Sequence, residues 1–259
     1  MEFQFIKYEI KENWAEIILN REDKLNSFNR EMSKEMIYAL DISEHNDNIR
    51  AILITGAGKA FCAGQDLAEA ISGKYEIDDI IREQYNPIIK RLRNIEKPIV
   101  SAVNGTAAGA GANIALACDI VIAHEKASFI QAFSKIGLIP DSGGTYILPR
   151  LIGMAKATAL MMTGEKVSAQ EAERMNMIYK AVSADEYDSY INNLLKNISN
   201  MPTKALGLIK RALNHTYTNS LQAQLELEEI LQKESSESYD YKEGVSSFLE
   251  KRAPVFKGK

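Results

Sequence analysis

Three short, almost wholly apolar runs separated by helical segments constrain the fold more than any other feature. They are Ala51–Thr55, Ile99–Val103 and Ile120–Ala123. Runs of this length without polar alternation are typical of strands that are buried on both faces. Helices are predicted between them, from about Ile77 to Ile95 and from about Ala110 to Leu116. Repeated strand–helix–strand order predicts an α/β fold with a mostly parallel sheet.

Weaker signals flank this pattern. Phe3–Tyr8 and Trp14–Leu19 are predicted to form an opening hairpin, and Asn29 is placed to cap a helix from about Arg30 to Ile42. From about residue 145 the pattern is mainly helical, with segments near 152–162, 169–175, 186–198, 203–214 and 221–234. We therefore expect an α/β body over residues 1–200. Residues 201–259 are expected to form a helical segment that cannot bury its own apolar faces and packs on the body and on a neighbouring subunit.

Composition narrows the class of protein. The 259 residues are 46% hydrophobic and 25% charged, and 31 Lys and Arg oppose 35 Asp and Glu, for a net charge of −4. This balance argues against a general nucleic-acid or anionic-membrane binder. No stretch has the 18 or more apolar residues of a membrane helix. Cys62 and Cys118 form no CxxC pair and only three histidines are present, so we expect no disulfide framework and no metal site, in a cytoplasmic protein.

Two glycine-containing loops follow the first two apolar runs. The first loop, Ala60–Leu67, lies where ligands bind at the carboxyl ends of parallel strands. Taken alone, the loop is better explained as a plain strand-to-helix turn with a packed Cys62. The second loop, Asn104–Asn113, leads into a small-residue helix. Its free N–H groups could stabilise an oxyanion, or its small residues could serve close helix packing. Its spacing is not GxGxxG, which disfavours a dinucleotide site.

The third loop, Ile136–Gly144, places one carboxylate, Asp141, in an apolar, glycine-rich turn. Two interpretations compete. Asp141 could cap the helix that follows. Alternatively it is a partly desolvated carboxylate whose pKa is raised, so that it exchanges a proton near neutrality.

Taken in this order, the three loops resemble the crotonase (enoyl-CoA hydratase/isomerase) superfamily over nearly the whole chain. Arg21–Ser27 resembles the family's early acyl-CoA loop, and the MMTGEKVSAQEA segment resembles its mid-chain helix and turn. Four fragments are similar to the ring 1,2-epoxyphenylacetyl-CoA isomerases of phenylacetate degradation: Leu25–Asn29, Tyr85–Pro87, Ala132–Lys135 and Glu243–Leu249. The resemblance implies a spiral of ββα units with a C-terminal helical region, assembled as a homo-oligomer, either a trimer or a dimer of trimers.

The resemblance also implies an acyl-CoA site. The thioester oxygen would accept the backbone N–H groups of Gln65 and Ala110, which form an oxyanion hole. Residues that would contact the substrate or its CoA part are Lys24, Leu25, Ala63, Asp66, Leu67, Asn113 and Phe133. The basic pair Lys251–Arg252 is expected to join Lys24 at the adenosine phosphate end, because a net negative chain must hold a polyanion with local cations.

The carboxylates decide the expected reaction. Hydratases of the family have glutamates where this chain has Asn113 and Phe133, and adding water needs groups that activate and deliver it. Asp141 matches the acid/base aspartate of family isomerases. It also matches the nucleophile of a family dehalogenase, whose supporting tryptophan this chain lacks. We therefore expect an acyl-CoA isomerase with Asp141 as its catalytic group and no metal or redox cofactor, since CoA enters as part of the substrate. The alternatives are a hydratase of the same family and a noncatalytic acyl-CoA-binding protein.

Overall fold

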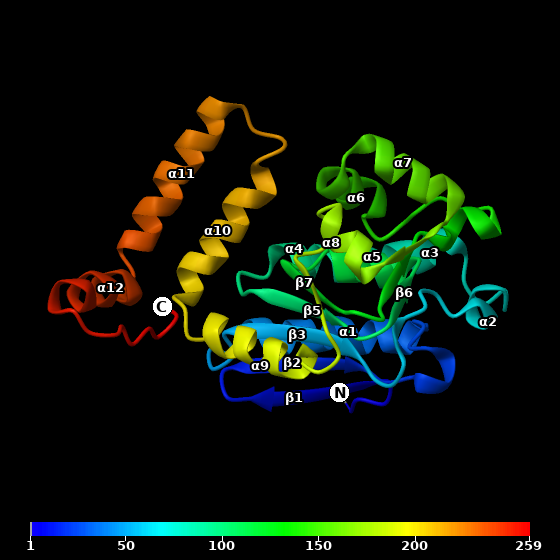
Figure 1. The fold of residues 1–259 in the computed structure, drawn as a ribbon, viewed down its shortest axis with the longest axis horizontal. Helices are drawn as coiled ribbons and strands as arrows, with labels where there is room; N and C mark the ends of the chain where they lie inside the picture. The colour runs from blue at the N-terminus through cyan, green and yellow to red at the C-terminus, as the bar shows by residue number, and fades with distance from the viewer. Residues whose placement is uncertain (1) are drawn as a thin grey trace.

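A six-stranded, mostly parallel sheet is the base of the fold in the computed structural model, which describes residues 2–259 and leaves only Met1 outside (Figure 1). The strand order is β1-β2-β3-β5-β7-β10. The first two strands form the predicted antiparallel hairpin, and every other neighbouring pair is parallel. The bounds are β1 Ile6–Lys11, β2 Trp14–Leu19, β3 Ala51–Gly56, β5 Ile99–Val103, β7 Ile120–His124 and β10 Lys180–Val182.

The three apolar runs form the centre of this sheet as β3, β5 and β7. Successive side chains of a strand point to opposite faces, so each run supplies two cores. One face, with Leu53, Val100 and Ile122, packs against helix α9 (Tyr187–Ile198). The opposite face, with Ile54 as a member, belongs to the main core. Burial on both faces explains why these strands lack polar alternation.

A second, four-stranded sheet in the order β4-β6-β8-β9 was not expected from the apolar runs. Its strands have three residues each: β4 Ala60–Cys62, β6 Thr106–Ala108, β8 Ser128–Ile130 and β9 Lys166–Ser168. Because β3 leads to β4, β5 to β6 and β7 to β8, the chain winds as a spiral that adds one strand to each sheet per turn. The predicted spiral of ββα units is therefore confirmed.

Helices cover the sheets and form the C-terminal part of the chain. Asn29 caps α1 as predicted, its side chain accepting the N–H of Met32. The helix expected over 77–95 is divided by one π-helical turn, Ile81–Tyr85. A separate α-helix, Gly144–Ile152, precedes the helix expected over 152–162. The bounds are α1 Arg30–His45, α2 Leu67–Ala70, α3 Ile77–Ile80, α4 Asn86–Asn94, α5 Ala110–Leu116, α6 Gly144–Ile152, α7 Met154–Thr163, α8 Ala169–Arg174, α10 Thr203–His215, α11 Leu221–Ser236 and α12 Tyr239–Glu250, with 3₁₀ turns at Glu22–Lys24 and Ala132–Ile136.

The last three helices extend away from the sheets, on the left of Figure 1. Polar contacts fasten α10 to the body: Lys210 donates to Asp119 at 2.8 Å, and Arg93 donates to Asn214 at 2.6 Å. Helix α11 packs along α10, and α12 follows it. Across residues 2–259, none of the helices combines the length and apolar character that crossing a membrane requires.

Candidate active site

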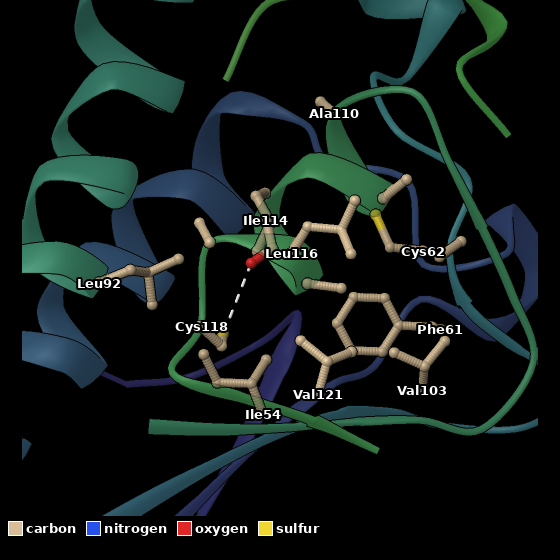
Figure 2. Packing of buried hydrophobic residues seen from close by; sticks show 14 of the residues in the cluster. Ile54, Phe61, Cys62, Leu92, Val103, Ala110, Ile114, Leu116, Cys118 and Val121 are labelled. Atoms are coloured by element: carbon tan, nitrogen blue, oxygen red, sulfur yellow. Dashed lines mark hydrogen bonds between the residues drawn. The ribbon is translucent and has the colours of Figure 1, made fainter. Parts of the chain in front are cut away.

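The first and second loops lie against each other at the start of α5. A Cβ added to Gly64 would lie 2.9 Å from the carbonyl oxygen of Ala108 and 3.5 Å from the nitrogen of Ala110. A Cβ added to Gly111 would lie 2.6 Å from the Sγ of Cys62. Figure 2 shows Cys62 packed beside this small-residue helix. The small residues therefore do serve close packing, and that packing brings the two loops together.

Two backbone N–H groups have no hydrogen-bond acceptor where these loops meet. Within residues 2–259, neither the N–H of Gln65 nor that of Ala110 donates to an acceptor. Ala110 begins α5, and the first N–H groups of a helix have no intrahelical partner. It is only 3% exposed. A buried unpaired donor costs about 1–3 kcal/mol, so the pair is suited to an incoming carbonyl oxygen.

The third loop is tied to the second through Asp141. The side chain of Asn113 donates to the carbonyl oxygen of Asp141 at 2.9 Å. The Asp141 carboxylate accepts the hydroxyl of Ser142 at 2.8 Å. Helix α6 has Gly143 as its N-cap and no capping side chain. The interpretation of Asp141 as a helix cap is therefore wrong, because its carboxylate makes no bond to the helix N–H groups.

Burial changes the acidity of Asp141. It raises the pKa of the carboxyl above its ordinary value, and the Ser142 hydrogen bond offsets part of that rise. A carboxylate with a raised pKa is a better base and exchanges a proton closer to neutral pH. Burial thus shifts the pKa of Asp141 in the direction expected for a group that moves protons.

The other carboxylate of the loops, Asp66, has a structural environment. It accepts the N–H groups of Ala68 and Glu69 at the start of α2 and pairs with Arg21 at 2.8 Å. Burial alone would raise the pKa of Asp66, but the Arg21 guanidinium and the backbone donors outweigh burial and lower it. Asp66 therefore stays ionised and is unsuited to proton exchange near neutrality.

The early loop, Arg21–Ser27, lies directly against the first loop. The carbonyl oxygen of Leu25 accepts the N–H of Ala63 at 2.9 Å, and the N–H of Asp66 donates to Phe28 at 2.8 Å. These N–H groups are therefore unavailable to a ligand, which leaves carbonyl oxygens and side chains for the predicted contacts. Lys24 is exposed, and the Leu67 side chain is 54% exposed.

The second predicted cationic contact lies elsewhere in the molecule. Arg252 pairs with Glu243 at 2.6 Å and with Glu250 at 2.7 Å. Helix α12, which ends just before Arg252, and helix α2, which follows the first loop, lie at opposite ends of the molecule (Figure 1). Within one chain, Lys251–Arg252 does not join Lys24.

Asn113 and Phe133 occupy the inner side of the site. Asn113 is 1% exposed, and both ends of its amide are bonded to protein groups. Phe133 is 6% exposed, and a Cβ added to Gly109 would lie 3.8 Å from its ring. Neither residue can supply a carboxylate to the site.

Tyr85 is a residue of the site that the sequence did not single out for chemistry. It ends the π-helical turn, is 1% exposed, and its hydroxyl donates to Gln65 Oε1 at 2.6 Å. Burial, together with the charges of Asp141 and other acids nearby, raises the pKa of Tyr85 well above its ordinary value. The phenol therefore stays neutral. A π-helical turn often marks a functional site, but this turn cannot be recognised from sequence.

Comparison with known proteins gives the family. The profile of the family described as "Enoyl-CoA hydratase/isomerase" matches residues 9–259. The chain belongs to this family. The "1,2-epoxyphenylacetyl-CoA isomerase" of Escherichia coli (strain K12) is 44% identical over 260 residues, 99% of each chain. A "Probable enoyl-CoA hydratase" of Rhodobacter capsulatus is 42% identical over the whole of both chains.

A solved family structure agrees with the fold. The enoyl-CoA hydratase of Bacillus anthracis superposes with a TM-score of 0.92 at 32% sequence identity, and the match covers 99% of this chain and 100% of that one. Relatives of the chain thus carry the names of both reactions. These relatives are named for reactions of CoA thioesters, and the choice of reaction depends on the groups in the site.

Proposed function

We propose that this chain is an acyl-CoA isomerase. In this proposal the thioester oxygen accepts the N–H groups of Gln65 and Ala110, and Asp141 transfers a proton at the neighbouring carbon. The observation that carries it is Asp141, a partly buried carboxylate whose pKa is raised by that burial. Its loop is bonded to α5, the helix that begins at Ala110, which carries one of the two unpaired N–H groups. Removing a proton beside a thioester moves negative charge onto its oxygen, which is the charge that such donors stabilise.

An isomerisation fits a site with one acid/base group. Asp141 takes a proton from one carbon, the electron pair moves toward the thioester oxygen, and the proton returns at a second carbon, so the product has the formula of the substrate. Hydration would need groups that position and deliver water, and Asn113 and Phe133 carry no carboxylate. This isomerisation requires no metal or redox cofactor, because the product has the formula of the substrate. CoA enters only as part of the substrate.

The substrate that we propose is ring 1,2-epoxyphenylacetyl-CoA, converted to the isomeric oxepin, in phenylacetate degradation. Its support is the 44% identity to the isomerase of that name. Shifting a double bond in an enoyl-CoA would use the same proton transfers. In this proposal the CoA part of the substrate lies along Lys24, Leu25, Ala63, Asp66 and Leu67.

The test is Asp141→Asn. Asn has nearly the same size but cannot take up a proton, so we expect kcat to fall by roughly 10² to 10⁴. Exchange of solvent deuterium into the carbon beside the thioester should fall in parallel, while binding of acyl-CoA is retained. The matched control is Asp240→Asn, at a buried carboxylate that bonds Lys257 and Gly258 in the C-terminal region. A variant that keeps more than about a tenth of the rate would remove Asp141 from the mechanism.

The similarity to a "Probable enoyl-CoA hydratase" at 42% identity makes hydration the second candidate. Crotonyl-CoA distinguishes the two functions. Turnover of crotonyl-CoA to its hydrated product, with no turnover of the arylacetyl-CoA epoxide or of 3,4-enoyl-CoA, would favour the hydratase. Binding of all these thioesters without turnover would favour a noncatalytic acyl-CoA-binding protein.

We also propose that the chain works as a homo-oligomer, a trimer or a dimer of trimers. The C-terminal helices support this proposal, since they leave large apolar side chains exposed that the body does not cover. Examples are Leu221, Phe248 and Leu249, which are 76%, 83% and 74% exposed.

A further inference from the structure

Two buried amide side chains connect the end of strand β8 to the third loop. Gln131 donates through Nε2 to Oδ1 of Asn113 at 2.8 Å. Asn113 donates through Nδ2 to the carbonyl oxygen of Asp141 at 2.9 Å. Gln131 and Asn113 are 4% and 1% exposed. The Gln131–Asn113 bond is thus buried, and loss of either side chain would leave a buried polar group of the other unsatisfied.

The direction of the Asn113 amide follows from its two neighbours. The Asp141 carbonyl is an acceptor and needs a donor, so the NH₂ group of Asn113 must face it. The Gln131 NH₂ group then meets the remaining oxygen of Asn113. An amide donates at one end and accepts at the other, as these two neighbours require, whereas an ionised carboxylate can only accept.

The backbone at Asp141 is held from two sides. Its carbonyl oxygen accepts the N–H of Gly144 at 2.8 Å in addition to the Asn113 bond. A Cβ added to Gly144 would lie 2.3 Å from Nδ2 of Asn113, so the loop backbone packs directly on the amide. Ser142 has a φ of +51°, a left-handed conformation that a non-glycine residue adopts at a cost. Such a turn persists only where its surroundings fix it.

We propose that Asn113 is a positioning residue for Asp141, and that Gln131 fixes the direction in which Asn113 donates. The proposal rests on the proposed role of Asp141 as the group that moves the proton. It also makes position 113 decisive for the reaction. A carboxylate at position 113 could act as an acid/base group on water. When ionised, however, it would face the Asp141 carbonyl oxygen with a second acceptor in place of a donor. The third loop of this chain is therefore compatible with asparagine at position 113 and not with glutamate.

The first test compares two nearly isosteric variants. Asn113→Asp adds a charge and Asn113→Leu does not, but both remove the donor to Asp141. A misplacement of about 1 Å costs on the order of 10² in rate, so we expect kcat to fall about 10- to 100-fold in both variants. KM for the acyl-CoA should change less than about twofold, and deuterium exchange beside the thioester should fall with kcat. Ser101→Ala is the control, because it deletes another buried bond to α5, that of Ser101 Oγ to Ala115, without touching the third loop.

The second test uses Gln131→Leu, which leaves Asn113 in place with its amide free to turn. We expect a smaller fall in kcat, about 3- to 10-fold, and the Asn113→Leu/Gln131→Leu double variant should match Asn113→Leu alone, since the two residues act as one unit. This variant also serves if the Asn113 variants do not fold. Wild-type kcat in the folded variants, or losses that match those of Ser101→Ala, would overturn the positioning role. Should Asp141→Asn itself remain active, the proposed function fails instead.

Discussion

At the scale of single residues, two aspartates of the site lie in different surroundings, which shift their pKa values in opposite directions. Asp66 lies beside Arg21 and backbone donors, which keep it ionised. Asp141 is more deeply buried and has one hydroxyl donor, so its pKa rises. Groups whose environments push their pKa values apart are a common sign of divided roles. Here one carboxylate stabilises the early loop, and the other remains free for chemistry.

The raised pKa of Asp141 predicts a stability difference that depends on pH. Because the folded pKa exceeds that of the unfolded chain, about 3.9 for an ordinary Asp, this group favours folding at low pH. The contribution is lost as pH rises through the folded value. Asp141→Asn removes the titration, so the free energy of unfolding of the variant minus that of the wild type should increase from pH 4 to pH 7. Urea denaturation at several pH values measures it, and a difference that stays constant or declines would contradict the raised pKa.

At the scale of helices and strands, the sequence predicts elements whose signal is local. The strands β3, β5 and β7, the Asn29 cap and helix α5 all lie where residue pattern places them. The N-terminal hairpin is present too, but its first strand begins three residues later than the predicted Phe3. The small sheet was missed because Ala60–Cys62 and Thr106–Ala108 are too short and too small-sided to show alternation. Their pairing is a property of the spiral, which brings distant segments side by side.

The candidate site also has features that could be predicted from the sequence and features that could not. The three loops could be located from sequence, because each contains glycine and the first two follow apolar runs. The interactions of Tyr85 and Gln131 could not, since Tyr85 meets Gln65 across 20 residues and Gln131 meets Asn113 across 18. The rejection of Asp141 as a helix cap also needed coordinates. The N-cap of α6 falls two residues later, at Gly143, through a left-handed turn that residue preferences do not specify.

Glycine-to-alanine substitution should have opposite effects on stability in α5, which packs closely on β4, and in α12, which does not. Gly111→Ala would place a Cβ 2.5 Å from the Cys62 carbonyl oxygen and 2.6 Å from its Sγ. Such overpacking should lower the free energy of unfolding by about 1–3 kcal/mol. Gly244→Ala in α12 meets only Phe256, at 3.5 Å, and should raise it by up to about 1 kcal/mol, since Ala favours helix. Chemical denaturation of both variants checks this, and equal effects would contradict the close contact.

At the scale of the whole molecule, the body and the C-terminal helices differ in how well their apolar groups are covered. The body buries two cores against its sheets. Helices α10 and α11 instead border an open groove lined by apolar groups that include Leu208, Leu225 and Leu231. Large exposed apolar surfaces mark interaction sites. A second copy of the chain carries the same surface, and closed symmetric assemblies arise from such contacts.

Association of the chain should therefore be visible in its mass. We expect light scattering at micromolar concentration to give three or six times 28.9 kDa. Phe248→Asp places a charge on the most exposed apolar side chain of α12 and should reduce the mass toward one chain, because a charge without a partner is costly to bury in an interface. Gln222→Asp adds the same charge at an exposed polar position and should leave the mass unchanged. A stable monomer of the unmodified chain would contradict the prediction, and the apolar face would then have to be covered within one chain by movement of α11 and α12.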